Sequence, residues 1–286
     1  MADDPPVPAG DDPPHDDDTP PDGWPAPPGV DPSIPSSARV YDYALGGRNN
    51  YAIDRETAEK VFAVAPEMRA MARQNRSFLG RLVRFLSAEA GIRQFLDIGS
   101  GLPTQRNVHQ VAQEIAPGSR VVYVDHDPVV LRYAEALLAT SDTVTAVQAD
   151  LRRPEEILGH PDVRGLIDSS QPVAVLLVAV LHFVPDEDDP LAAVARLKDA
   201  MAPGSHLAVS HVTSELRPVE IGRLVQLSAR AGAPWVARDR AQIQRFLDGL
   251  EMVDPGLVTA PEWRPEVARS VDPEKMWVYA GVGRKR

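Results

Sequence analysis

The sequence predicts a doubly wound α/β domain, with helices on both faces of a mostly parallel β-sheet. Between residues 92 and 286, short β-branched or apolar runs alternate with stretches of helical length, as is typical of strands joined by helical crossovers. The run at 173–180 is apolar throughout, which favours a strand buried on both faces. Aspartates follow the first three expected strands, and sheets of this kind bind ligands at that carboxyl edge.

The elements follow in order along the chain. Residues 39–55 resemble a loop around the turn-forming pairs Gly46-Gly47 and Asn49-Asn50. A helix with an apolar face then runs to Gly91, a typical helix end. Strands are expected at 94–98, 120–125, 144–148, 173–180, 205–210, 251–258 and 276–282, and the helices between them at 105–115, 128–139, 188–201, 214–231 and 239–247. Pro128 is typical of a first helical turn.

The first 38 residues differ in composition from the rest of the chain. They contain twelve prolines, nine aspartates and neither lysine nor arginine. Such a segment buries too little apolar surface to offset the entropy of ordering it, so we expect a disordered tail at 1–38. The tail carries −9 of the net charge of −11 and leaves −2 for the remainder. Residues 39–286 are expected to form a single domain, with an N-terminal lid and helices at 39–91 and the sheet core at 92–286.

Composition argues against several classes of protein. The chain has no cysteine, which excludes disulfides and thiolate metal sites, and no other metal site is expected. The longest apolar run, 173–184, is too short to span a bilayer core of about 30 Å, and no signal peptide opens the chain. The sequence contains no basic stripe, so it gives no indication of nucleic-acid binding. We therefore expect a cytoplasmic protein with a small-molecule partner, without a membrane or nucleic-acid partner. The oligomeric state stays open.

The most informative motif is Asp97-x-Gly99-x-Gly101, at the end of the first expected strand. Glycine lets the backbone approach a ligand closely. A dinucleotide-binding turn has a third glycine where this chain has Thr104, and the Asp97 carboxylate would repel a pyrophosphate. The acid suits a ligand with a cationic end, such as S-adenosylmethionine, which has an ammonium, a sulfonium and no phosphate. The alternative is a purely structural strand-to-helix turn.

Asp125 and Asp150 follow the second and third expected strands. A carboxylate at the first of these positions can accept both hydroxyls of a ribose. One at the second can accept from an adenine amine, while the next backbone N–H reaches a ring nitrogen. The alternative is that these aspartates cap helices, and we favour that interpretation for Asp127, which precedes Pro128.

These motifs together resemble the class I S-adenosylmethionine-dependent methyltransferases. Residues 39–51, R-V-Y-D-Y-A-L-G-G-R-N-N-Y, resemble the opening of one bacterial family in that class, formerly of unknown function. The resemblance extends to 256–258 and 263–265 and so covers 39–286. It implies a Rossmann-like seven-stranded sheet of order 3-2-1-4-5-7-6 with an antiparallel last strand. The continuation Leu102-Pro103-Thr104 departs from the glycine-rich one of many class members.

The resemblance also implies roles for individual residues. Gly99 and Gly101 would lie under the methionine and ribose of the cofactor, and Asp97 would face its amino group. Asp125 would hold the ribose. The adenine would be contacted by His126, Asp150 and Leu151.

The acceptor side is less sharply marked. His182 follows the fourth strand and is either a general base or, as we favour, a packed histidine. Residues 39–55 are either a lid over the cofactor, which we favour, or a brace. The lid interpretation places Tyr43, Gly46, Gly47 and Asn50 at the cofactor. Candidate acceptor-binding residues are Tyr41, Arg48, Phe183 and Trp263. The arginines at 217–245, Arg238 among them, are interspersed with acids and indicate a solvated face.

Three functions compete. The leading hypothesis is an enzyme that transfers a methyl group from S-adenosylmethionine to a small-molecule acceptor. The second is a protein that binds S-adenosylmethionine without methyl transfer. The third, disfavoured by Asp97 and Thr104, is an NAD-dependent oxidoreductase.

Overall fold

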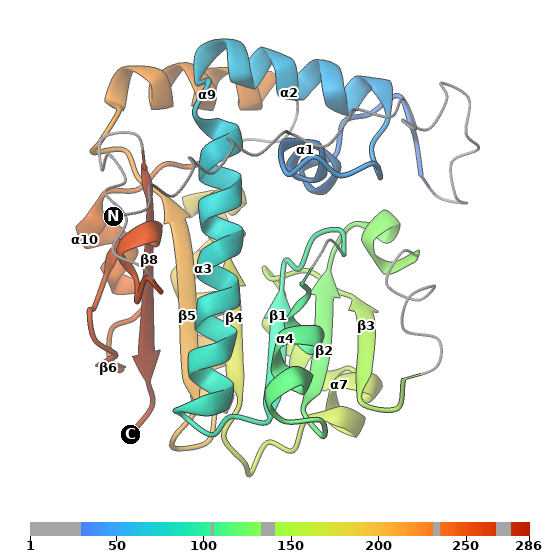
Figure 1. Cartoon of the computed structure of the whole chain (residues 1–286), viewed down its shortest axis with the longest axis vertical. Coiled ribbons are helices and arrows are strands. Elements are labelled where there is room, and N and C mark those ends of the chain that lie inside the picture. The colour runs from blue at the N-terminus through green and yellow to red at the C-terminus, as the bar shows by residue number, and fades with distance from the viewer. Residues whose placement is uncertain (1–29, 104–105, 133–140, 231–234, 267–275) are drawn as a thin grey trace, which may run out of the picture.

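A computed structural model describes residues 30–103, 106–132, 141–230, 235–266 and 276–286 (Figure 1). Most of the predicted tail, at 1–29, lies outside the described residues. So do residues 104–105 and residues 133–139 of the helix expected at 128–139. Within the described ranges, no helix is long and apolar enough to cross a membrane.

The sheet runs through the whole molecule, and its order confirms the predicted fold class. Its strands are β1 Gln94–Ile98, β2 Arg120–Asp125, β3 Val144–Gln148, β4 Ala174–Val178, β5 His206–Val212, β6 Glu251–Met252, β7 Val258–Thr259 and β8 Val278–Arg284. Their order is β3-β2-β1-β4-β5-β8-β6, and β7 pairs with β8. Strands β1 to β5 are parallel, and the last strand, β8, is antiparallel to β5.

The structure differs from the prediction at the sixth strand. The single strand expected at 251–258 is two short strands, β6 and β7, separated by a turn. Pro255 has no N–H to donate to a ladder, and Gly256 has a φ of +86°. The final strand is therefore the eighth and not the seventh.

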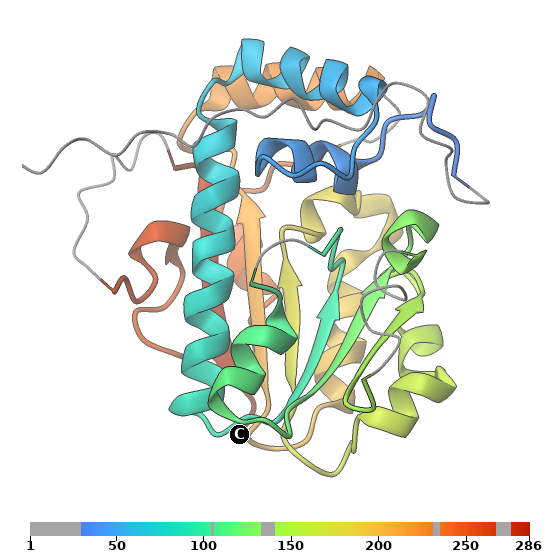
Figure 2. The same cartoon turned by 45° about the vertical axis from the view of Figure 1, so that its right-hand side comes forward.

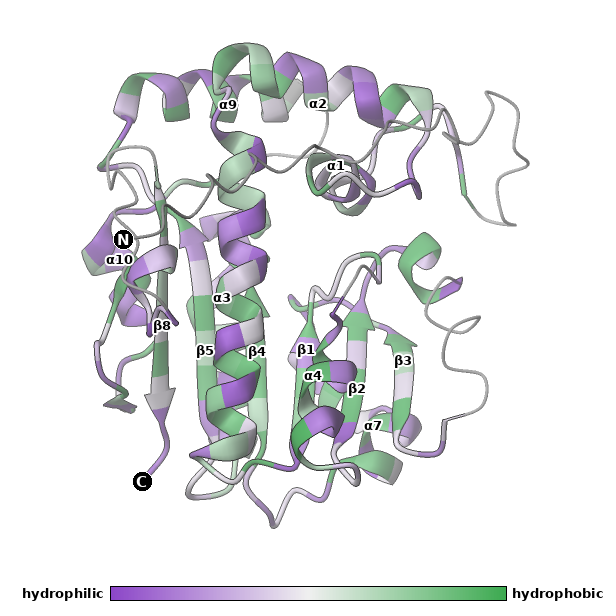
Figure 3. Ribbon diagram, in the orientation of Figure 1, coloured by the Kyte–Doolittle hydropathy of each residue, from purple (hydrophilic) through white to green (hydrophobic). Residues whose placement is uncertain are grey.

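Helices cover both faces of the sheet (Figure 2). α3 (Met68–Ala88) and α4 (Val108–Ile115) pack on one face, against a cluster that includes Phe95 and Val121. The opposite face carries α6 (Pro154–Gly159), α7 (Pro161–Leu166), α8 (Pro190–Ala200) and α10 (Arg240–Arg245). Successive strand residues point to opposite faces, so the neighbour Leu96 belongs to this second cluster. The strands are largely hydrophobic in Figure 3, which agrees with burial on both faces.

A third group of helices lies over the carboxyl ends of the parallel strands (Figure 1). It consists of α1 (Ser37–Ala44), α2 (Ala52–Val64) and α9 (Pro218–Arg230), and α3 extends down from it along the sheet. The prediction of a loop at 39–55 was wrong, since α1 and the start of α2 are helical. The helical period of α1 is hidden in the sequence because two of its buried residues, Arg39 and Asp42, are charged.

Candidate functional site

The glycine turn after β1 is fixed by its backbone and by its neighbours. Gly99 and Gly101 have φ values of +73° and +65°, which glycine adopts without a steric penalty. The N–H of Gly99 donates to the carbonyl of Val124 on β2 at 2.7 Å. A Cβ at Gly99 would lie 2.3 Å from Cγ2 of Val180, whereas a Cβ at Gly101 would meet nothing within 4 Å. Gly99 is thus required by the packing of Val180, and open space lies beside Gly101.

Asp125 connects the glycine turn to the end of β2. Its Oδ2 accepts the N–H of Gly101 at 2.9 Å, and its Oδ1 accepts the N–H of Asp127 at 3.0 Å. Burial raises the pKa of Asp125, while these two backbone N–H groups act in the opposite direction. Each carboxylate oxygen has a second acceptor position, so Asp125 can still accept hydrogen bonds from ligand hydroxyls.

Asp97 belongs to β1, the neighbour of β2 in the sheet, and is 5% exposed. Burial raises the pKa of Asp97 to about 7; the charge of Arg76 on α3 lowers it, and that of Asp125 raises it further. Near neutral pH the group is balanced between its two protonation states. A cation next to it would favour the carboxylate.

Asp150 lies at the same edge but already has a strong partner. Nε and Nη2 of Arg152 donate to its Oδ2 at 2.9 and 2.6 Å. Burial would raise the pKa of Asp150, but the hydrogen bonds and charge of Arg152 outweigh it and the pKa is lowered. His126 is exposed, and its Nδ1 lies 3.5 Å from Oδ1 of Asp125. The side chain of Leu151 is buried in the core.

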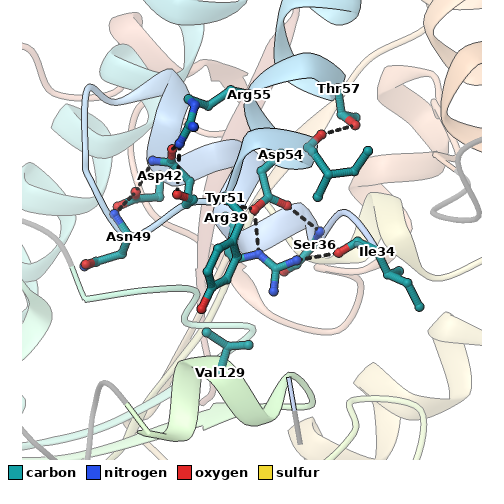
Figure 4. A network of polar contacts seen from close by, with 12 residues as sticks. Ile34, Ser36, Arg39, Asp42, Asn49, Tyr51, Asp54, Arg55, Thr57 and Val129 are labelled. Carbon is teal, nitrogen blue, oxygen red and sulfur yellow. Dashed lines mark hydrogen bonds and ion pairs between the residues drawn. The ribbon is translucent and has the colours of Figure 1, made fainter. Parts of the chain in front are cut away.

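Residues 36–51, which include most of the segment 39–55 expected to form a lid and are called the lid below, are held to α2 by one buried carboxylate (Figure 4). Asp54 is fully buried and accepts the N–H of Ser36 at 2.9 Å, Nε of Arg39 at 2.7 Å and the N–H of Tyr51 at 2.8 Å. Sequence reasoning missed this role, because an aspartate near a helix start is usually an exposed cap.

The turn at 45–51 is organised around a second buried carboxylate, Asp42. It accepts Nδ2 of Asn50 at 2.9 Å, and a Cβ at Gly47 would lie 2.1 Å from its Oδ1. Gly46 has a φ of +84°. The hydroxyl of Tyr43 donates to Glu59 on the outer side of α2. All four lid residues expected at the cofactor therefore have contacts within the lid and α2.

The lid nevertheless touches the carboxyl edge. Oγ of Ser36 donates to Oδ2 of Asp127 at 2.5 Å, and Ala38 packs on a small cluster of Leu102 and Val129. Oδ1 of Asp127 accepts the N–H of Val129 at 2.8 Å, as the helix-cap interpretation expects. The lid thus lies over the loops that follow β1 and β2.

On the acceptor side, His182 is buried next to Phe183, with ring centroids 4.5 Å apart. Burial lowers the pKa of His182 well below its ordinary value, and the neighbouring His211 and Arg238 lower it further. Its Nδ1 has no hydrogen-bond partner among the described residues. His182 is consequently neutral at physiological pH and a weak proton acceptor.

Arg238 corrects the interpretation of the arginine series as a solvated face. It is 3% exposed. Its Nη1 donates to the carbonyl of Leu181 at 3.0 Å and contacts Nε2 of His211 at 2.9 Å, and its Nη2 donates to the carbonyl of Val184 at 2.9 Å. Arg238 therefore secures the loop after β4 to the end of β5. Sequence reasoning missed it because it lies just outside α10, beside arginines that are exposed.

The remaining acceptor candidates are dispersed. Trp263 is fully buried in edge contact with Phe78 and Phe85, in the core under α3, and is not brought to the carboxyl edge. Arg48 is exposed. The hydroxyl of Tyr41 is bonded to α3. Within the described ranges, no three acidic or histidine side chains are grouped to hold a metal ion.

The sheet order, the glycine turn and the acids at the carboxyl edge define the class of S-adenosylmethionine-binding α/β proteins. The family model described as S-adenosyl methyltransferase matches residues 24–286. The chain belongs to that family, and its cofactor is S-adenosylmethionine.

Two solved structures are similar to this chain over nearly its whole length. A DUF574 family protein from Streptomyces avermitilis is 41% identical, with a TM-score of 0.86, over 88% of this chain and 98% of that protein. A candidate methyltransferase from Thermobifida fusca is 43% identical, with a TM-score of 0.87, over 92% of this chain and 99% of that protein. No curated protein matches the chain.

Proposed function

We propose that the protein transfers the methyl group of S-adenosylmethionine to a small-molecule acceptor bound beside the loop at 179–183. The bound cofactor supplies a methyl carbon made electrophilic by the neighbouring sulfonium. The observation that carries the proposal is the pair of buried acids, Asp97 and Asp125, on either side of the glycine turn. Two carboxyl groups suit a ligand with an ammonium and a diol and are unsuited to a diphosphate.

The residues at this edge fit the cofactor. Asp97 would hold the ammonium, because a cation stabilises a carboxylate that burial otherwise disfavours. Asp125 would accept the ribose hydroxyls through its remaining acceptor positions. The open space at Gly101 would take the ligand itself. His126 and the backbone at 150–151 would lie at the adenine, with Asp150 turned toward Arg152.

The acceptor side supports transfer without a protein base. His182 is neutral and buried with a strongly lowered pKa, so it would shape the pocket and not remove a proton. The acceptor would then bind with a lone pair already available for attack on the methyl carbon. Alignment of that lone pair with the methyl–sulfur bond would supply the catalysis, since good alignment of reacting groups lowers a barrier by about 7–11 kcal/mol. The weak base also favours a second function, cofactor binding without transfer. Formation of S-adenosylhomocysteine with candidate acceptors distinguishes the two.

Calorimetry with S-adenosylhomocysteine and with NAD tests the proposal. We expect the first to bind and the second not to. Asp125→Asn should lower the affinity for S-adenosylhomocysteine about tenfold, the effect of a lost hydrogen bond to a charged group. Asparagine is preferable to alanine because it keeps an acceptor for one of the two N–H groups, of Gly101 or of Asp127, whereas alanine leaves both without one.

Asp168→Asn is the matched control. This exposed carboxylate also accepts a backbone N–H, that of Ser170 at 2.9 Å, but it precedes β4 at the opposite edge of the sheet. It should leave the affinity unchanged. Equal affinities of wild type and Asp125→Asn, or tighter binding of NAD, would contradict the proposal.

A further inference from the structure

A continuous chain of hydrogen bonds runs from the lid through α3 to the end of β4. The N–H of Ala179 donates to Oγ of Ser210 at 2.9 Å and also, at 3.2 Å, to the backbone carbonyl of the same residue. Oγ of Ser210 donates to Oδ1 of Asn75 at 2.7 Å. Nδ2 of Asn75 donates to the hydroxyl of Tyr41 at 3.1 Å, and that hydroxyl donates to the carbonyl of Ala72 at 3.1 Å. We call these residues the lid relay: Tyr41, Asn75, Ser210 and Ala179.

The direction of the lid relay is fixed. A backbone N–H, which can only donate, begins it, and a backbone carbonyl, which can only accept, ends it. Every hydroxyl and amide between them must therefore accept from one neighbour and donate to the other. Asn75 and Ser210 are 5% and 0% exposed, so a missing link leaves a buried polar group unsatisfied. Chains of this kind are cooperative.

One end of the lid relay lies on the lid, and the other end lies next to the glycine turn. Tyr41 is on α1, the lid helix. Ala179 has a φ of +57°, an uncommon conformation for a residue with a side chain and one that surrounding structure must hold. The next residue, Val180, fills the space over Gly99. β1 and β4 are neighbours in the sheet and flank the switch in strand order, where such sheets bind ligands.

We propose that Asn75 and Ser210 are positioning residues that make the lid, the glycine turn and the loop carrying His182 respond as one unit. Through the lid relay, the placement of α1 over the cofactor edge sets the position of Val180 against Gly99. This inference rests on the proposed function for its meaning, because the turn is where the cofactor would lie. Neither residue need touch the cofactor.

Hydrogen exchange in the ligand-free protein tests the relay independently of binding. The amide of Ala179 is the far end of the chain, so Tyr41→Phe should speed its exchange by roughly fivefold, the factor of one net hydrogen bond. A local structural role of Tyr41 would leave this amide unaffected. Unchanged exchange at Ala179 would overturn the inference, whatever the protein binds.

A double-mutant cycle adds the functional readout. Tyr41→Phe and Ser210→Ala should each weaken binding of S-adenosylhomocysteine, and the double variant should be no weaker than the worse single one, because one broken link already interrupts the chain. Losses that multiply would overturn the inference. Failure of the wild type to bind S-adenosylhomocysteine would instead contradict the proposed function, and the exchange result would still decide on the relay.

Ser205→Ala is the matched control for Ser210→Ala. Ser205 is also fully buried next to β5, and its hydroxyl likewise accepts a backbone N–H, that of Val173 at 3.0 Å. It lies at the amino edge of the sheet and outside the lid relay. Its variant should not change the exchange of Ala179 or the affinity for S-adenosylhomocysteine.

Discussion

At neutral and higher pH, the buried carboxylate of Asp97 lowers the stability of the ligand-free protein. Its pKa is about 7 in the folded protein and 3.8 in an ordinary environment, so desolvation disfavours the carboxylate. A cationic ligand would relieve that cost. Under the proposed function, stability and binding would therefore oppose each other at this position, as is common at functional sites.

This opposition predicts a pH-dependent effect of Asp97→Asn. Between pH 3.8 and about 7, the folded state holds a proton that the unfolded state has released, so the free energy of unfolding decreases as pH rises through this window. Asparagine does not titrate. Relative to wild type, the variant should gain roughly 2–3 kcal/mol between about pH 5 and about pH 8, measured by urea unfolding. A constant difference between the two pH values would show that the raised pKa is wrong.

Residues of the candidate site differ in how far the sequence reveals them. Asp97, Gly99 and Gly101 form a local motif whose meaning follows from the strand before it. Arg238 and Asn75 act through partners that are far away in sequence, such as Leu181 and Ser210. No local pattern distinguishes these buried polar residues from exposed ones, because their burial is decided by tertiary contacts.

At the scale of elements, α1 and α2 are joined by a hydrophobic cluster that includes Ala44 and Phe62, and by a buried ion pair. Arg39 and Asp54 form an ion pair of 2.7 Å, with side chains 3% and 0% exposed. Removing one member of a buried pair leaves an uncompensated charge, which typically costs about 3–5 kcal/mol. The ion pair therefore fixes the position of α1 relative to α2.

Asp54→Asn should loosen the lid while the sheet stays folded. The new side-chain amide would leave Arg39 without its counter-ion. Its NH2 group would also replace one of the two oxygens that accept from Ser36, Arg39 and Tyr51, so at least one of these donors would lose its acceptor. Limited proteolysis should open sites within residues 36–51, with the circular dichroism of the sheet retained. Glu56→Gln is the control on the same helix, because Glu56 is exposed and exposed charges contribute at most about 1 kcal/mol. Equal protection of both variants would contradict the role of Asp54.

At the scale of the whole molecule, periodicity and strand composition predict the alternating α/β sheet, and the family resemblance predicts its order and the antiparallel last strand. Other parts were missed for physical reasons. The helices α6 and α7, of six residues each, are too short to show a period. The lid helix α1 buries Arg39 and Asp42, and these charged residues interrupt the apolar pattern by which a helix is predicted. The sixth strand is divided at Pro255 and Gly256, and the prediction included both residues in one continuous strand.

The proposed function places the cofactor at the carboxyl edge of the sheet, below α1, α2 and α9. A crystal structure with S-adenosylhomocysteine tests this placement most directly. We predict the ribose hydroxyls within hydrogen-bonding distance of Asp125 and the ammonium facing Asp97, beside Gly101. A ligand bound elsewhere, or one whose ribose and ammonium face away from both carboxyl groups, would contradict the account.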